Sequence, residues 1–147
     1  MVFDAGIFSL NQVNGRPLMG LGERAGDLFY TESGIHSRYT FDQANPIDDG
    51  LPPGRNMYGF QPLYVYQNPS NKWMGVFDLN PYATDYVLEY NGGLSTRVTK
   101  ISIGGSIQKY FFVGSKPDDV VITYEKLTGR PLVPPLWSFG WQCNYNY

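Results

Sequence analysis

The chain has 147 residues, of which 42% are hydrophobic and 16% charged, with a formal net charge of −2 and a pI near 5.2. It has no cluster of lysines and arginines to displace counterions from phosphates, which excludes a nucleic-acid partner, and no apolar run approaches the ~18 residues of a membrane span. Cys143 is the single cysteine, so an internal disulfide is excluded, and we expect a buried, inert thiol. His36 is the single histidine, which excludes zinc sites built on several His or Cys ligands and leaves a Ser-His-Asp triad only through His36 itself.

The first ten residues, MVFDAGIFSL, do not have the pattern of a signal peptide. Such a peptide has a positively charged start, an apolar stretch and a small-residue cleavage site. We therefore predict no signal peptide in this chain. Either the protein is cytosolic or the chain does not contain its own beginning.

The stretch 42–58 contains three prolines, two glycines and three acids, without apolar periodicity. A structureless stretch of this length is uncommon in a compact domain and is usually functional or disordered. A strand-like run follows from Gly59, so we predict a loop that is tethered at both sides. Loops carried by a rigid scaffold are where binding residues concentrate.

Short runs rich in aromatic and β-branched residues alternate with turn residues through the remainder of the chain before residue 115. These runs cover 59–67, 72–80, 85–90, 95–103 and 106–114. The first two flank the turn cluster Asn68-Pro69-Ser70-Asn71, which predicts a hairpin. Strands at a spacing of about 8–12 residues are typical of a β-sandwich. The predicted fold class is mainly β, an antiparallel β-sandwich.

Residues 117–128 change to a helical period. The apolar residues of this stripe are Val120, Val121, Tyr124 and Leu127. Pro117 fits the first turn of a helix, and the two acids after it face the positive end of the helix dipole. Gly129 can adopt the left-handed conformation that ends a helix. We therefore predict one short helix over about 117–128.

Prolines concentrate directly after this helix and predict a stiff connector with a domain boundary near residue 130. They are Pro131, Pro134 and Pro135. The aromatic-rich run 137–145 then predicts a strand that enters a core. Trp137 and Trp141 share one face of such a strand. We expect both to pack against a neighbouring domain, with a sugar-stacking platform as the alternative.

Several blocks carry a resemblance to a known family. They are GLGER (20–24), GIHSRYTFDQANP (34–46), NMYGFQPLYVY (56–66), GVFDLN (75–80) and the segment from IGGSIQ to the last residue (103–147). In this order they resemble glycoside hydrolase family 31, the α-glucosidases and their relatives. The last block is similar to the family's Gly-Gly-Ile-Leu-Asp strand, its Pro-containing helix, and its Gly-Arg-Pro and Pro-Pro-x-Trp elements. The style of the hairpin blocks is closer to the lysosomal and digestive α-glucosidases.

The resemblance implies that residues 1–130 are the family's N-terminal β-sandwich, of the galactose-mutarotase-like kind. It implies that residues 131–147 are a linker and the first strand of a (β/α)₈ catalytic barrel, a fold of about 250 residues with its active site at the C-terminal ends of the strands. The segment before Gly20 is short for the family's opening strands. Retaining glycosidases use two carboxylates, and the resemblance sets both on barrel strands beyond Tyr147. We therefore predict no catalytic residue and no cofactor in this chain.

The resemblance also implies partners and a location. The partners are an oligosaccharide substrate and the missing C-terminal catalytic barrel, and the location is the secretory pathway, lysosomal or extracellular. Asp42 matches the family's aspartate on a loop that reaches the barrel mouth and hydrogen-bonds sugar hydroxyls, and carboxylate oxygens suit this because they only accept. Asp42 is the one substrate-binding residue that we predict, with a solvated loop aspartate as the alternative. For Glu23 we expect a structural role, accepting hydrogen bonds from loop amides or Arg24, over a ligand contact.

Two functions remain open at this point. One is the N-terminal, non-catalytic part of a retaining α-glucosidase that hydrolyses terminal α-linked glucose from oligosaccharides. The other is a freestanding carbohydrate-binding or structural β-domain derived from such an enzyme. The strand-like end of the chain favours the first function. Departures from the family pattern favour the second; they are Thr40-Phe41, Phe60-Gln61, Gln108 and Asn144.

Overall fold

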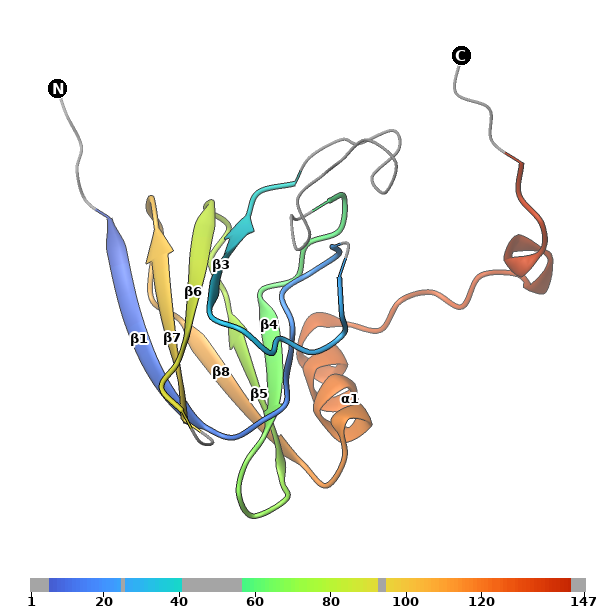
Figure 1. Cartoon of the computed structure of the whole chain (residues 1–147). Helices are drawn as coiled ribbons and strands as arrows, with labels where there is room; N and C mark the ends of the chain where they lie inside the picture. The colour runs from blue at the N-terminus through green and yellow to red at the C-terminus, as the bar shows by residue number, and fades with distance from the viewer. Residues whose placement is uncertain (1–5, 25, 41–56, 93–94, 144–147) are drawn as a thin grey trace, which may run out of the picture.

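The computed structural model describes residues 6–24, 26–40, 57–92 and 95–143. The strands in these ranges are β1 (Ile7–Asn14), β2 (Leu18–Gly20), β3 (Gly34–Arg38), β4 (Leu63–Gln67), β5 (Trp73–Asp78), β6 (Thr84–Tyr90), β7 (Ser95–Ser102) and β8 (Lys109–Gly114). The helices are α1 (Pro117–Thr128) and a 3₁₀ turn, η1 (Leu136–Phe139). Figure 1 shows two layers of strands, with α1 beside the layer that contains β4, β5 and β8.

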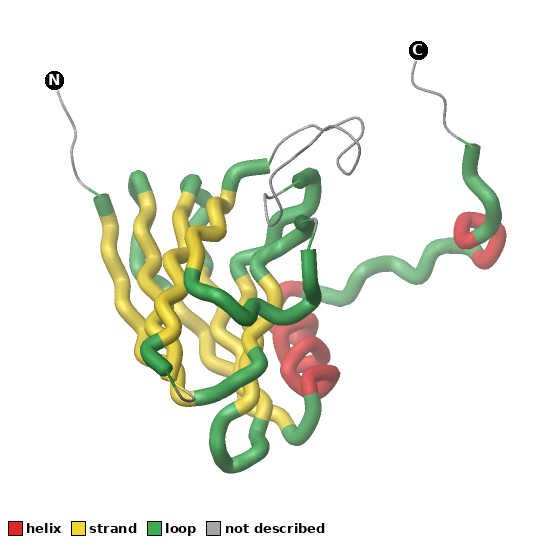
Figure 2. The backbone as a smooth tube through the Cα atoms, in the orientation of Figure 1, coloured by secondary structure: helices red, strands yellow, loops and turns green. Residues whose placement is uncertain are grey.

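The eight strands form two four-stranded sheets, and all neighbours within a sheet run antiparallel (Figure 2). Sheet 1 has the order β1-β7-β6-β3, and sheet 2 has the order β2-β4-β5-β8. The hairpin β4–β5 closes through residues 68–72, where the Asn68 side chain accepts hydrogen bonds from the Ser70 and Lys72 amides. An asparagine that hydrogen-bonds the backbone just ahead of it is an ordinary way to close a turn.

The sandwich core follows from the alternation of side chains along each strand. In β7, residues Thr96, Val98, Lys100 and Ser102 are buried, while the residues between them are partly or fully exposed. The apolar residues buried between the sheets are Val13, Leu18, Leu21, Tyr64, Val76, Tyr86, Leu88 and Val98. Lys100 lies in the same layer, 1% exposed, so a charge is buried inside this core.

Helix α1 covers the outer face of sheet 2. Val120 is fully buried in a cluster with Phe77 and Phe112, and Tyr124 packs edge-on against both phenylalanine rings. The Asp119 carboxylate accepts hydrogen bonds from the Ser115 and Lys116 amides, which satisfies donors at the N-terminus of the helix. The sequence-based fold class is confirmed: a mainly β antiparallel sandwich, with its helix at the predicted residues 117–128.

The first three strands were not located individually from the sequence. β1 and β2 both lie within residues 7–20, the segment that the sequence predicts to be short for opening strands. β1 pairs along its whole length with β7, from Ile7↔Ser102 to Asn14↔Ser95. Such a pairing joins segments far apart in the sequence, and no local signal reveals it.

Two expectations about the end of the chain, a strand from residue 137 and a buried Cys143, are wrong over the residues described. Residues 137–143 are not a strand; Leu136–Phe139 form η1, in which the Ser138 amide donates to the Pro135 carbonyl at 2.9 Å. Trp137 and Trp141 are 75% and 93% exposed within this chain. Their packing against a neighbouring domain is not tested by this exposure and stays a prediction. Cys143 is exposed rather than buried. A strand needs a partner for its backbone groups, and in the described structure this segment extends away from both sheets (Figure 1).

Candidate functional site

The GLGER segment forms a sharp turn directly after β2. Gly20, Leu21 and Gly22 have φ angles of 116°, 64° and 94°. A side chain at Gly20 would meet the Leu63 carbonyl at 2.4 Å, so glycine is required there. Leu21 is buried and left-handed, which costs free energy for a branched side chain. Its amide donates to the Leu63 carbonyl at 2.9 Å, and this bond and its burial hold the turn in place.

This turn directs Glu23 towards the residues that precede β4. The Glu23 amide donates to the Gly59 carbonyl at 2.8 Å, and the Met57 amide donates to the Glu23 carbonyl at 3.0 Å. The Gly59 amide donates to Glu23 Oε2, also at 3.0 Å. The expected structural role of Glu23 as an acceptor for a loop amide is therefore confirmed. Arg24 is engaged elsewhere, donating to the Leu21 carbonyl and to His36.

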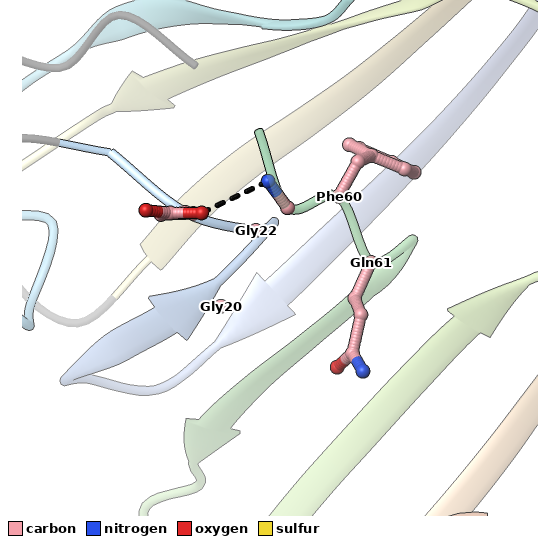
Figure 3. A pocket seen from close by; sticks show the side chains of 6 residues that line it. Gly20, Gly22, Phe60 and Gln61 are labelled. Carbon is pink, nitrogen blue, oxygen red and sulfur yellow. Dashed lines mark hydrogen bonds between the residues drawn. The ribbon is translucent and has the colours of Figure 1, made fainter. Parts of the chain in front are cut away.

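A hollow of about 470 Å³ opens between the two hydrogen-bonded segments. It is lined by Gly20, Gly22, Glu23, Gly59, Phe60 and Gln61. In Figure 3 the side chains of Phe60 and Gln61 leave the backbone in different directions, and the dashed line marks the bond from Gly59 to Glu23. Carboxylate, amide and backbone groups here can bond hydroxyl groups of a ligand.

Residues 39–59 join β3 to the segment that forms one wall of this hollow. Arg38 is the last residue of β3, and its guanidinium lies 4.2 Å from the centroid of the Phe60 ring. Arg38 also donates a hydrogen bond to the Asn80 carbonyl. Asp42, the predicted substrate-binding residue, lies outside the described residues, as do Phe41 and Asn144.

Arg24, the last residue of the GLGER segment, lies next to His36 of β3. Arg24 Nη1 donates to His36 Nδ1 at 2.7 Å, and the His36 ring lies 4.3 Å from the Tyr30 ring. A guanidinium only donates, so Nδ1 must stay unprotonated to accept. Burial, followed by the charge of Arg24, lowers the pKa of His36 to about 4. With this packing His36 is a neutral structural acceptor, and no described serine–carboxylate pair lies against it to form a triad.

We expect the stability of the folded chain to fall as the pH drops from about 6.5 to about 4 because of His36. In this window the unfolded chain binds a proton at His36 and the folded chain does not, so proton binding lowers the free energy of unfolding. Because the ring is partly exposed and water screens the charge, we expect a loss of about 1–2 kcal/mol. Urea denaturation at pH 7 and pH 4 measures it. His36→Asn should lose less stability over that range than the unsubstituted chain, and an equal loss would contradict the role of His36.

Gln108, one of the departures from the family pattern, makes a hydrogen bond within the fold. Gln108 Nε2 donates to the Tyr110 hydroxyl at 2.7 Å.

No three His, Cys, Asp or Glu side chains gather into a possible metal site within the ranges that the structure describes. Nor does any described helix have the length and apolar character to cross a membrane.

Sequence comparisons find α-glucosidases over most of the chain. A lysosomal α-glucosidase from Bos taurus is 38% identical over 131 residues, which are 88% of this chain and 13% of that protein. A probable α/β-glucosidase from Aspergillus clavatus is 34% identical over 131 residues, 88% of this chain and 14% of that protein. Intestinal sucrase-isomaltase from Oryctolagus cuniculus is 33% identical over 135 residues, 88% of this chain and 7% of that protein. A scan against models of protein families finds no match.

Solved structures show the same fold. A cycloalternan-degrading enzyme from Trueperella pyogenes superposes with a TM-score of 0.70 at 20% identity, over 92% of this chain and 19% of that chain. A family 31 dextranase from Flavobacterium johnsoniae, complexed with glucose, superposes with a TM-score of 0.67 at 20% identity, over 95% of this chain and 16% of that chain. This chain is a glycoside hydrolase family 31 N-terminal region. It spans about one seventh or less of the length of the three relatives found by sequence, and 16% and 19% of the two solved chains.

Sequence reasoning missed two features of this family 31 region. One is the Arg38–Phe60 contact, because Phe60 was considered only as a departure from the family pattern. The other is the buried pair of Asp78 and Lys100, which are each 1% exposed with Lys100 Nζ 3.4 Å from Asp78 Oδ1. Strand alternation in β7 could have placed Lys100 on the inner face, since Val98 and Ser102 lie two residues to either side of it.

Proposed function

We propose that this chain is the non-catalytic N-terminal part of a retaining α-glucosidase that removes terminal α-linked glucose from oligosaccharides. The observation that carries the proposal is the 38% identity to a lysosomal α-glucosidase over 88% of the chain. In this proposal residues 1–130 are the sandwich, and residues 131–147 lead into a catalytic barrel that supplies both carboxylates. The protein acts in the secretory pathway, lysosomal or extracellular.

The chain's own contribution is to support the barrel and to present a substrate-binding residue, Asp42. Asp42 belongs to the predicted loop, and Glu23 in the GLGER turn holds the residues at the end of that loop through the hydrogen bonds to Met57 and Gly59. The GLGER turn is itself fixed to β4, because the Leu21 amide donates to the Leu63 carbonyl. Carboxylate oxygens accept strongly from sugar hydroxyls, so an aspartate at position 42 can orient a glycosyl unit.

The test uses the polypeptide that carries this sequence together with its continuation, with maltose as substrate. We expect hydrolysis of maltose, and we expect Asp42→Ala to lower kcat/KM about ten-fold, the value of one charge-assisted hydrogen bond. The melting temperature should not change, since Asp42 serves the ligand.

Two results would contradict the proposal. A protein of this sequence that binds oligosaccharides and has no hydrolytic activity would favour the freestanding carbohydrate-binding domain. An active enzyme with unchanged kcat/KM in Asp42→Ala would remove the role of Asp42 alone.

A further inference from the structure

The sequence contains two Asn-Gly steps, Asn14-Gly15 and Asn91-Gly92. Asparagine is a thermolabile residue, because the backbone nitrogen of the next residue can attack the carbon of its side-chain amide. A glycine in the next position has no side chain to shield that nitrogen and leaves the backbone free to rotate. Whether either step reacts in the folded protein therefore depends on how the fold holds its backbone.

The step Asn91-Gly92 lies between β6 and β7, where the fold leaves it open. Both residues are exposed, and Gly92 has a φ of 76°. A Cβ atom placed on Gly92 would meet no atom within 4 Å, so nothing packs against this glycine. The Asn91 amide donates to the Ser95 carbonyl at 3.3 Å, whereas the Asn91 side chain makes no hydrogen bond to the residues described. Neither packing nor a side-chain bond therefore opposes rotation about the Asn91 Cα–C bond, which brings the Gly92 nitrogen to the side chain.

The step Asn14-Gly15 is held by both sheets. Asn14 is the last residue of β1 and pairs with Ser95 of β7. Gly15 is buried, and a Cβ atom placed on it would overlap the Gln67 carbonyl at the end of β4. The same rotation at Asn14 would pull β1 away from β7 and Gly15 away from Gln67. This step can therefore react only when that end of the sandwich opens locally.

We propose that Asn91 is a site of spontaneous deamidation and isomerisation in the folded protein, and that the fold protects Asn14. The Gly92 nitrogen gives its proton to solvent hydroxide and forms a bond to Asn91 Cγ. The bond from Cγ to the side-chain nitrogen breaks, and that nitrogen takes a proton from water and leaves as ammonia. One water molecule then opens the succinimide ring at either carbonyl, which yields aspartate or isoaspartate. The sum is one amide and one water converted to one carboxylic acid and one ammonia.

The modification changes the end of sheet 1 at which three strands meet. Isoaspartate carries the main chain through its side-chain carbon, so the backbone gains a methylene group and the surface gains a negative charge. The amide of residue 91 is bonded to Ser95, the residue of β7 that also pairs with Asn14. A longer backbone at position 91 therefore disturbs the point at which β7 is joined to both β1 and β6.

The test incubates the purified protein that carries this sequence at mildly alkaline pH and follows both Asn-Gly peptides by mass spectrometry. Isoaspartate is recognised by methylation with an isoaspartyl methyltransferase. In the folded protein we expect Asn91 to react at least about ten-fold faster than Asn14 and to give isoaspartate. In concentrated urea both steps are unfolded, and their rates should agree within about two-fold. The rate at Asn91 should fall at acidic pH, since the attacking nitrogen must lose its proton.

Two matched variants assign the reaction to its residue. Asn91→Gln keeps a side-chain amide but would have to close a larger ring, so it should remove the product from this peptide. Asn14→Gln should leave the rate at Asn91 unchanged. Equal rates at Asn91 and Asn14 in the folded protein would overturn the inference, because the fold would then protect neither step. Aspartate without isoaspartate would also overturn it, since direct hydrolysis of the side chain bypasses the succinimide.

Discussion

Lys100→Met is expected to lower the free energy of unfolding by about 3–5 kcal/mol, the effect of removing one partner of a buried ion pair. Lys100 Nζ lies 3.4 Å from Asp78 Oδ1, and the Tyr86 hydroxyl donates to Asp78 Oδ2 at 3.2 Å. All three residues are at most 1% exposed. Without the ammonium, the carboxylate remains in the core with one neutral donor. Urea denaturation of the two proteins measures the difference.

A second variant separates the ion pair from the loss of packing. Asp78→Leu combined with Lys100→Met removes both charges and keeps apolar volume, so it should be more stable than Lys100→Met alone. A double variant that is less stable than the single one would contradict the argument. The control is Lys116→Met, whose ion pair with Asp118 is exposed and should matter by less than about 1 kcal/mol.

Gly75→Ala is expected to destabilise the chain by about 1–3 kcal/mol by displacing helix α1. A Cβ atom at Gly75 would stand 2.4 Å from Val120 Cγ1 and 3.3 Å from Phe112 Cδ2. Val120 is fully buried, and a valine in a helix strongly prefers one rotamer, so it cannot turn aside. The helix must therefore move away from β5. Urea denaturation gives the loss, and hydrogen exchange of α1 amides locates it.

Removing the clashing atom should restore part of the stability. Val120→Ala alone leaves a cavity, yet Gly75→Ala and Val120→Ala together should cost less than the sum of the two single changes. Additive costs would show that the helix does not meet β5 through these two residues.

The parts of the fold that the sequence predicted are those with local signals. The helix is bounded by Pro117 and Gly129, and the amide of Gly129 indeed closes it by donating to the Glu125 carbonyl at 2.8 Å. The β4–β5 hairpin follows from turn residues between two apolar runs. The aromatic run after Pro135 led to a wrong prediction, a strand from residue 137, because that prediction also used local composition alone. Aromatic composition favours a strand, but a strand forms only where another strand lies beside it.

The candidate site was predicted in part. The flanking glycines predict a tight turn in which Glu23 accepts a hydrogen bond from a loop amide, and the bond from the Gly59 amide confirms this. The contact between Arg38 and the Phe60 ring could not be predicted, because it depends on how β3 and the segment before β4 meet in space. The low pKa of His36 likewise depends on burial beside Arg24, and a single histidine in a sequence carries no sign of that.

The pairing of β1 with β7 has a consequence for how the protein is made. The hydrogen bond between Gln12 and Ser95 joins residues 83 positions apart. At roughly 5–20 residues per second of synthesis, β1 leaves the ribosome roughly 4–16 seconds before β7, its partner in the described structure, exists. During that interval the nascent chain carries an unpaired strand with apolar residues, which is a typical target for chaperones. Sheet 1 can therefore close only after β7 has been synthesised. Substitutions that slow the pairing of β1 with β7 should lower the yield of folded protein even where they leave the free energy of unfolding nearly unchanged.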